Sequence, residues 1–104
     1  GDEATIAAVI GCLEGADEAA ARTLLEVLVE VADRGHDGAV RAVISCVTGR
    51  YGQPLRRLSE AALRALPRLA EAGDQRALVV ASACLRHTDA LTRRAAREAL
   101  LQLA

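Results

Sequence analysis

The sequence predicts an all-α protein, an α-solenoid of three successive two-helix units, and two observations carry that prediction. Of the 104 residues, 52% are apolar, yet Phe, Trp and Met are absent and Tyr51 is the one aromatic residue. Ala and Leu, the best helix formers, make up most of the apolar residues. The second observation is an internal repeat: Cys12, Cys46 and Cys84 recur 34 and 38 residues apart within similar flanking sequence. Units of that period expose an apolar face that only the next unit can cover.

The repeat divides the chain into units of about 1–34, 35–72 and 73–104, which together make one domain. Gly1 stands at the repeat position of Gly35 and Gly73, and Ala104 stands where Ala32 closes the first unit. The chain therefore begins and ends at unit boundaries. We expect this domain to be a segment of a longer array.

The first helix of each unit is expected at about 3–14, 37–48 and 75–87. Its main apolar stripe has helical spacing, as in Ile6, Val9, Ile10 and Leu13 of the first unit. A second stripe of small residues runs beside it. This stripe consists of Thr5, Ala8 and Cys12 in the first unit, Ala39, Ala42 and Cys46 in the second, and Ala77, Val80 and Cys84 in the third. Two adjacent stripes predict a helix that packs on its partner helix and also on the neighbouring unit.

The second helices are expected at about 18–33, 54–71 and 90–103. Aspartates stand directly before four of the six expected helices and predict N-caps, namely Asp2, Asp17, Asp74 and Asp89. His36 occupies the equivalent N-cap position in the second unit.

Over essentially its whole length the chain resembles HEAT-type repeats, of the armadillo-like variety also found in phycobilin-lyase-like proteins. The resemblance rests on Asp17 with Arg22, and on Asp89 with Arg93 and Arg94, because an interhelical Asp followed four or five residues later by Arg is typical of those repeats. It implies first helices on one face of a solenoid and second helices on the other. It also implies binding rather than catalysis, and a non-enzymatic scaffold that is an accessory or assembly subunit of a larger complex.

Charge is distributed unevenly along the chain, although the net charge is only −1. Residues 1–34 carry eight acidic and two basic residues, a net charge of −6, whereas residues 35–72 and 73–104 have net charges of +3 and +2. The candidate partner-binding residues are the second-helix arginines Arg57, Arg64, Arg68, Arg94 and Arg97. Arginine is enriched in interface hot spots, so we expect a protein partner with an acidic surface. Acidic and basic ends also allow salt-sensitive head-to-tail association between copies of the chain.

Two other functions fit the pattern less well. Nucleic-acid backbone binding along the arginine stripe is disfavoured by the near-neutral charge, the absence of Lys and the scarcity of aromatic residues. Assembly of a pigment–protein complex, as in phycobilin lyases, rests on the resemblance alone. No sequence motif indicates catalysis, a cofactor or a metal site, so we expect no enzyme activity.

The three cysteines are expected to be small buried apolar residues. Their spacing fits neither a zinc site nor a disulfide, and reduced thiols favour an intracellular or organelle-interior compartment. The apolar runs are too short for a membrane span.

Overall fold

The computed structural model describes residues 2–48 and 56–104. In this part of the chain it contains six α-helices and no β-strand, which confirms the all-α prediction. The helices are α1 (Glu3–Leu13), α2 (Glu18–Val31), α3 (Asp37–Thr48), α4 (Arg56–Leu69), α5 (Gln75–Cys84) and α6 (Ala90–Leu103). The predicted start of the fourth helix at residue 54 lies outside the described residues.

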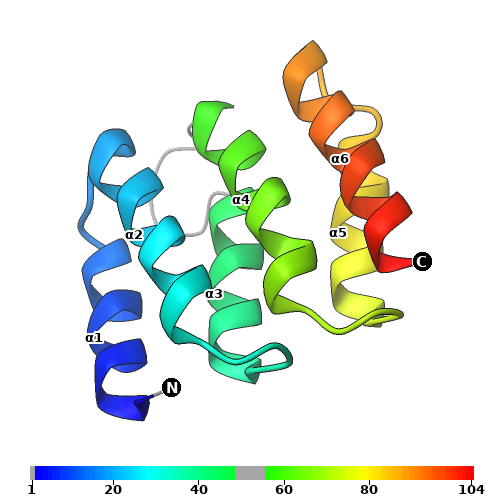
Figure 1. The fold of residues 1–104 in the computed structure, drawn as a ribbon. Helices are drawn as coiled ribbons and strands as arrows, with labels where there is room; N and C mark the ends of the chain where they lie inside the picture. The colour runs from blue at the N-terminus through cyan, green and yellow to red at the C-terminus, as the bar shows by residue number, and fades with distance from the viewer. Residues whose placement is uncertain (1, 49–55) are drawn as a thin grey trace.

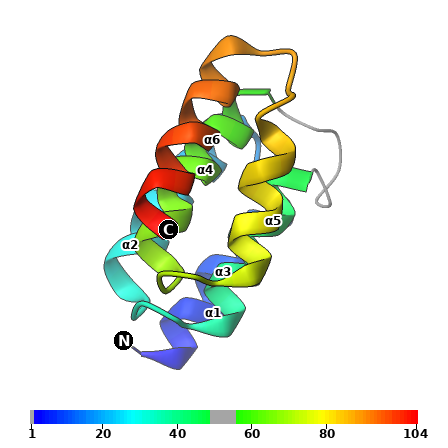
Figure 2. The ribbon, with the colours of Figure 1, turned by 90° about the vertical axis from the view of Figure 1, so that its right-hand side faces the viewer.

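Consecutive helices form three pairs, and the pairs lie side by side in two layers. Helices α2, α4 and α6 make one layer and α1, α3 and α5 the other (Figures 1 and 2). Helix α4 is central because it contacts α2, α3 and α6. The second helices contact one another more extensively than the first helices do. The two termini lie at opposite ends of the row of helices, whose principal extents are 35 × 28 × 17 Å.

The four predicted aspartate N-caps are confirmed, as is the capping histidine. The Asp17 carboxylate accepts a hydrogen bond from the Ala20 backbone amide at 2.8 Å, and Asp2, Asp74 and Asp89 cap their helices in the same way. His36 accepts a hydrogen bond at Nδ1 from the Ala39 amide at 3.1 Å. Each cap supplies a partner for an amide that has none within the helix.

Helices α2 and α5 end before their predicted limits of 33 and 87. After α5 the backbone tightens into hydrogen bonds between residues three apart, from the Leu85 amide to the Ser82 carbonyl at 3.2 Å and from the His87 amide to the Cys84 carbonyl at 3.1 Å. The apolar pattern continues past the point where the backbone leaves the α-helical geometry, so periodicity alone overestimates the helix length.

In the second and third helix pairs, a glycine at the start of the pair forms a hydrogen bond with the end of its second helix. Gly35 and Gly73 have φ values of +89° and +81°, in the left-handed region that favours glycine. Their amides donate to the last carbonyls of α4 and α6, Gly35 to Leu69 and Gly73 to Leu103, both at 2.7 Å. Each bond joins the start of a pair to its end and satisfies a carbonyl that the helix leaves open.

The small-residue stripe packs as predicted in α3 and α5 but not in α1. Ala39, Ala42 and Cys46 are at most 3% exposed, and Cys84 is also buried. The prediction that all three cysteines are buried is wrong for Cys12, which is exposed. The reason is position: no described helix lies against that side of α1, whereas the equivalent sides of α3 and α5 face a preceding helix.

Candidate functional site: a charged groove between α2 and α4

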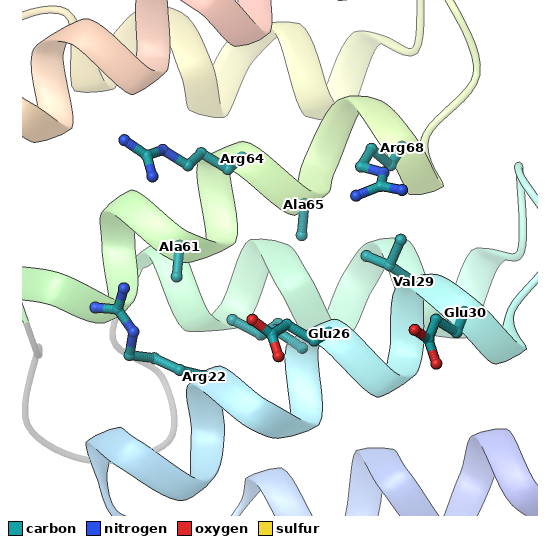
Figure 3. Close-up of a pocket in the computed structure, with 9 residues that line it drawn as sticks. Arg22, Glu26, Val29, Glu30, Ala61, Arg64, Ala65 and Arg68 are labelled. Carbon is teal, nitrogen blue, oxygen red and sulfur yellow. The ribbon is translucent and has the colours of Figure 1, made fainter.

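The predicted arginines Arg64 and Arg68 line a groove of about 410 Å³ between α2 and α4 (Figure 3). Its floor is apolar and small, formed by Leu25 and Val29 of α2 and by Ala61 and Ala65 of α4. The alanines keep the floor open, because larger side chains at these positions would fill the space between the two helices. The groove is therefore a shallow apolar channel with charged walls.

The two walls of the groove carry opposite charges. Glu26 and Glu30 project from α2, and Arg64 and Arg68 project from α4 (Figure 3). Arg22 adds a positive charge at one end of the acidic wall. All five side chains belong to exposed residues. In the part of the chain that the structure describes, no ion pair spans the groove between these walls.

Arg64 and Arg68 differ in how they are held. Arg64 forms an ion pair within α4, with 2.8 Å between its Nη2 and Oε2 of Glu60, whose side chain is only 12% exposed. Within the described part of the chain, Arg68 has no ion pair. Because Arg64 already neutralises a largely buried carboxylate, Arg68 is the arginine that can bind an external carboxylate at the lower cost.

The structure does not gather all five predicted arginines in one place. Arg57 lies in α4, but its side chain is outside the described part of the structure. Arg94 and Arg97 lie on α6, are exposed and are not among the residues lining this groove. Arg94 instead forms an ion pair with Glu98, with 3.5 Å between Nε and Oε1.

The sequence shows acidic residues on the first of the second helices and arginines on the later ones, but the groove that sets these charges opposite each other was not predicted. In the repeat alignment Glu26 and Glu30 occupy the same positions as Arg64 and Arg68, 38 residues later. Equivalent residues of adjacent units lie on neighbouring helices, so a change of charge between units places opposite charges across the groove.

Two further grooves lie on the first-helix layer at repeat-equivalent places. One, of about 480 Å³, runs between α1 and α3 and is lined by Ala7, Gly11 and Ala42 among others. The other, of about 620 Å³, runs between α3 and α5 and is lined by Ile44, Val79 and Val80 among others. Both are open surface features without a cluster of chemically reactive side chains.

One hydrogen bond and one ion pair at the helix starts of this layer join neighbouring helix pairs. His36 Nε2 lies 2.6 Å from Glu3 Oε2, and Arg76 Nη1 lies 2.5 Å from Asp37 Oδ1. Arg76 also donates to Asp74, and this hydrogen bond holds the pKa of the Asp74 carboxyl below its usual value. These contacts tie each pair to the next and use their charges within the fold.

Burial keeps the thiols of Cys46 and Cys84 in their protonated, weakly nucleophilic form. Burial raises the pKa of Cys46 to about 11 and also raises the pKa of Cys84. A thiol at neutral pH is a weak nucleophile and a weak metal ligand. Among the described residues, no three His, Cys, Asp or Glu side chains gather closely enough to hold a metal ion. In the same part of the chain, no helix has the length and apolar character needed to cross a bilayer.

Comparison with known proteins adds no family assignment. No protein-family model matches the chain, and no curated protein and no solved structure is significantly similar to it.

Proposed function

We propose that this chain is a non-enzymatic protein-interaction scaffold, an α-solenoid of three HEAT-like units that holds a partner protein in the groove between α2 and α4. Three side-by-side helix pairs with equivalent buried positions support the solenoid arrangement. The observation that carries the binding role is the pair of oppositely charged walls above an apolar floor.

The groove suits an amphipathic segment of a partner. Apolar side chains of such a segment rest on Val29 and Ala61, and acidic side chains on one edge meet Arg68. Glu26 and Glu30 disfavour a segment that is acidic on both edges. The partner surface is therefore acidic along the α4 wall and neutral or basic along the α2 wall.

Nucleic-acid binding along the arginines is less compatible with this arrangement. Phosphate backbones bind where basic side chains are free of competing carboxylates. Here Glu26 and Glu30 face the α4 arginines across the groove, and Glu60 and Glu98 are paired with Arg64 and Arg94. Carboxylates thus stand beside Arg64, Arg68 and Arg94 of the arginine stripe.

The test is affinity capture from a lysate of the source cells with the wild-type chain and two charge-reversal variants. Arg68→Glu reverses the charge in the groove. Arg34→Glu makes the same change at an exposed position outside the groove and serves as the matched control. Arg64 is left intact because reversing it would place a second carboxylate beside the nearly buried Glu60.

A bound protein whose recovery falls at least about tenfold with Arg68→Glu, but not with Arg34→Glu, supports the proposal; that loss corresponds to about 1.4 kcal/mol. Equal recovery with both variants contradicts a binding site in this groove. Bound nucleic acid, with recovery that falls steeply with salt, would favour the alternative.

A further inference from the structure

One side of the first helix pair is an uncovered packing face. It consists of Thr5, Ala8 and Cys12 on α1 and Ala20, Thr23 and Val27 on α2, which we call the open face. Val27 is partly exposed, and the other five residues are exposed. These are small or apolar side chains in a continuous stripe, so the face has the composition of a helix-packing surface rather than of a solvated one.

The equivalent residues of the other pairs show what the open face is built to do. Ala42 of α3 and Ala65 of α4, which correspond to Ala8 and Val27, are 3% and 7% exposed and line grooves against the preceding pair. In α6, Thr92, Ala95 and Ala99 correspond to Ala20, Thr23 and Val27, and each is at most 2% exposed. In the described structure this face is largely covered where another helix pair precedes it, with Ala61 of α4 and Val80 of α5 still partly exposed.

The opposite end of the molecule presents the complementary face. It consists of Arg86, which follows α5, and of Arg94, Arg97 and Leu101 on α6, which we call the basic end face. Leu101 is 70% exposed, and the three arginines are exposed as well. In the repeat alignment Leu101 corresponds to Val29, and Arg97 to Leu25, both of which contribute to the contact of α2 with α4. The basic end face therefore occupies the position from which each pair meets the next.

Charge separates these two faces. Glu26 and Glu30 border the open face, because their equivalents Arg64 and Arg68 border the contact of α4 with α2. The basic end face carries three arginines, and Glu98 beside them is paired with Arg94. Across the whole chain the first unit has a net charge of −6 and the third of +2.

We propose that two copies of this chain associate head to tail, with the basic end face of one molecule on the open face of the next. Helix α6 of the first molecule then lies against α2 of the second as α2 lies against α4 within one chain. Leu101 packs on Thr23 and Val27 of the second molecule, and Arg97 approaches its Glu26 and Glu30. The contact is heterologous, so it leaves one face of each kind free and extends into a row of molecules.

The test uses two variants that each block one face. Ala8→Arg places a large charged side chain on the open face. Leu101→Glu places a negative charge, which Glu26 and Glu30 of the second molecule repel, where the contact needs an apolar side chain. Both residues are exposed in the single molecule, so both variants fold, which helix content and thermal midpoint verify. Sedimentation velocity is measured with a reducing agent present, because Cys12 on the open face is an exposed thiol.

The wild-type sedimentation coefficient is expected to rise between about 10 µM and about 1 mM protein at low salt, and to fall when salt is raised to about 0.5 M. Each variant alone stays monomeric, whereas an equimolar mixture forms a dimer and nothing larger. The mixture works because the Ala8→Arg molecule keeps its basic end face and the Leu101→Glu molecule keeps its open face.

Three results would overturn the proposal: a monomeric wild type throughout this range, self-association of either variant alone, or a mixture that remains monomeric. The groove between α2 and α4 is intact in both variants, so partner capture by the groove can succeed or fail independently of this result.

Discussion

The three cysteines give a direct measure of how the helix pairs cover one another. Cys46 is 3% exposed and its pKa is raised to about 11 by burial, whereas Cys12 is exposed. At pH 8 a thiol of pKa about 11 is roughly 0.1% thiolate, while an unperturbed cysteine of pKa about 8.5 is roughly a quarter thiolate. Thiolate content alone therefore makes Cys46 about two hundred times less reactive than an unperturbed cysteine, and exclusion of the reagent slows it further.

The assay is reaction of the folded chain with a chromogenic disulfide reagent at pH 8, at a protein concentration low enough to keep the chain monomeric. One thiol is expected to react in a fast phase, and this phase disappears in Cys12→Ser. Cys84, which is 9% exposed with a raised pKa, reacts slowly, and Cys46 reacts slowly or only on unfolding. Three equal rates without denaturant, or a fast phase that survives Cys12→Ser, would refute the packing of α3 and α5 described above.

Three further predictions concern stability. Gly11→Ala is expected to raise the free energy of unfolding by about 1 kcal/mol, since this helical position leaves the added Cβ without a neighbour within 4 Å. Gly73→Ala is expected to lower it by about 1–2 kcal/mol, because Gly73 has a φ of +81°. Urea unfolding measures both changes. Leu66→Ala should cost about 3 kcal/mol, because the side chain is 0% exposed in the central helix, whereas Leu101→Ala in dilute solution changes the unfolding free energy by less than about 0.5 kcal/mol. The hydrogen bond from Thr92 lowers the pKa of Asp89, so its carboxylate contributes stability that is present above the unfolded pKa of about 3.9 and is lost as the pH falls through the lower folded value. Asp89→Asn keeps a capping side chain, so acid unfolding monitored by circular dichroism should depend less steeply on pH below about 4, and an unchanged profile would contradict this role.

The helices and their caps could be predicted from the sequence because their causes are local. Asp17 and Asp89 cap helices through amides two or three residues away, and the stripe of Ile6, Val9 and Leu13 needs only the helical period to be recognised. Such features depend on residues that are near one another in the chain, so repeat alignment identifies the caps of α1, α2, α3, α5 and α6 correctly.

The candidate site was only partly predictable because it depends on neighbours. The exposure of Cys12 follows from its place at the end of the row of helices, whereas the sequence treats it as equivalent to Cys46. The arginines were identified, but their separation into the groove and the basic end face depends on which helix lies beside each one. The pairing of Arg64 with Glu60 was within reach, since the two residues are four apart on one helix.

The glycine closures have a consequence for how such a chain can change in length. The amide of Gly35 and the carbonyl of Leu69 stand at the two boundaries of one unit, and Gly73 and Leu103 do the same in the next. A duplication or deletion that begins at one glycine and ends before the next moves donor and acceptor together, so it strands neither group without a hydrogen bond. Each of these units therefore contains both the donor and the acceptor of its closing hydrogen bond. Its hydrogen-bond closure permits recombination at the glycines, whereas a break inside a helix would separate residues that depend on each other.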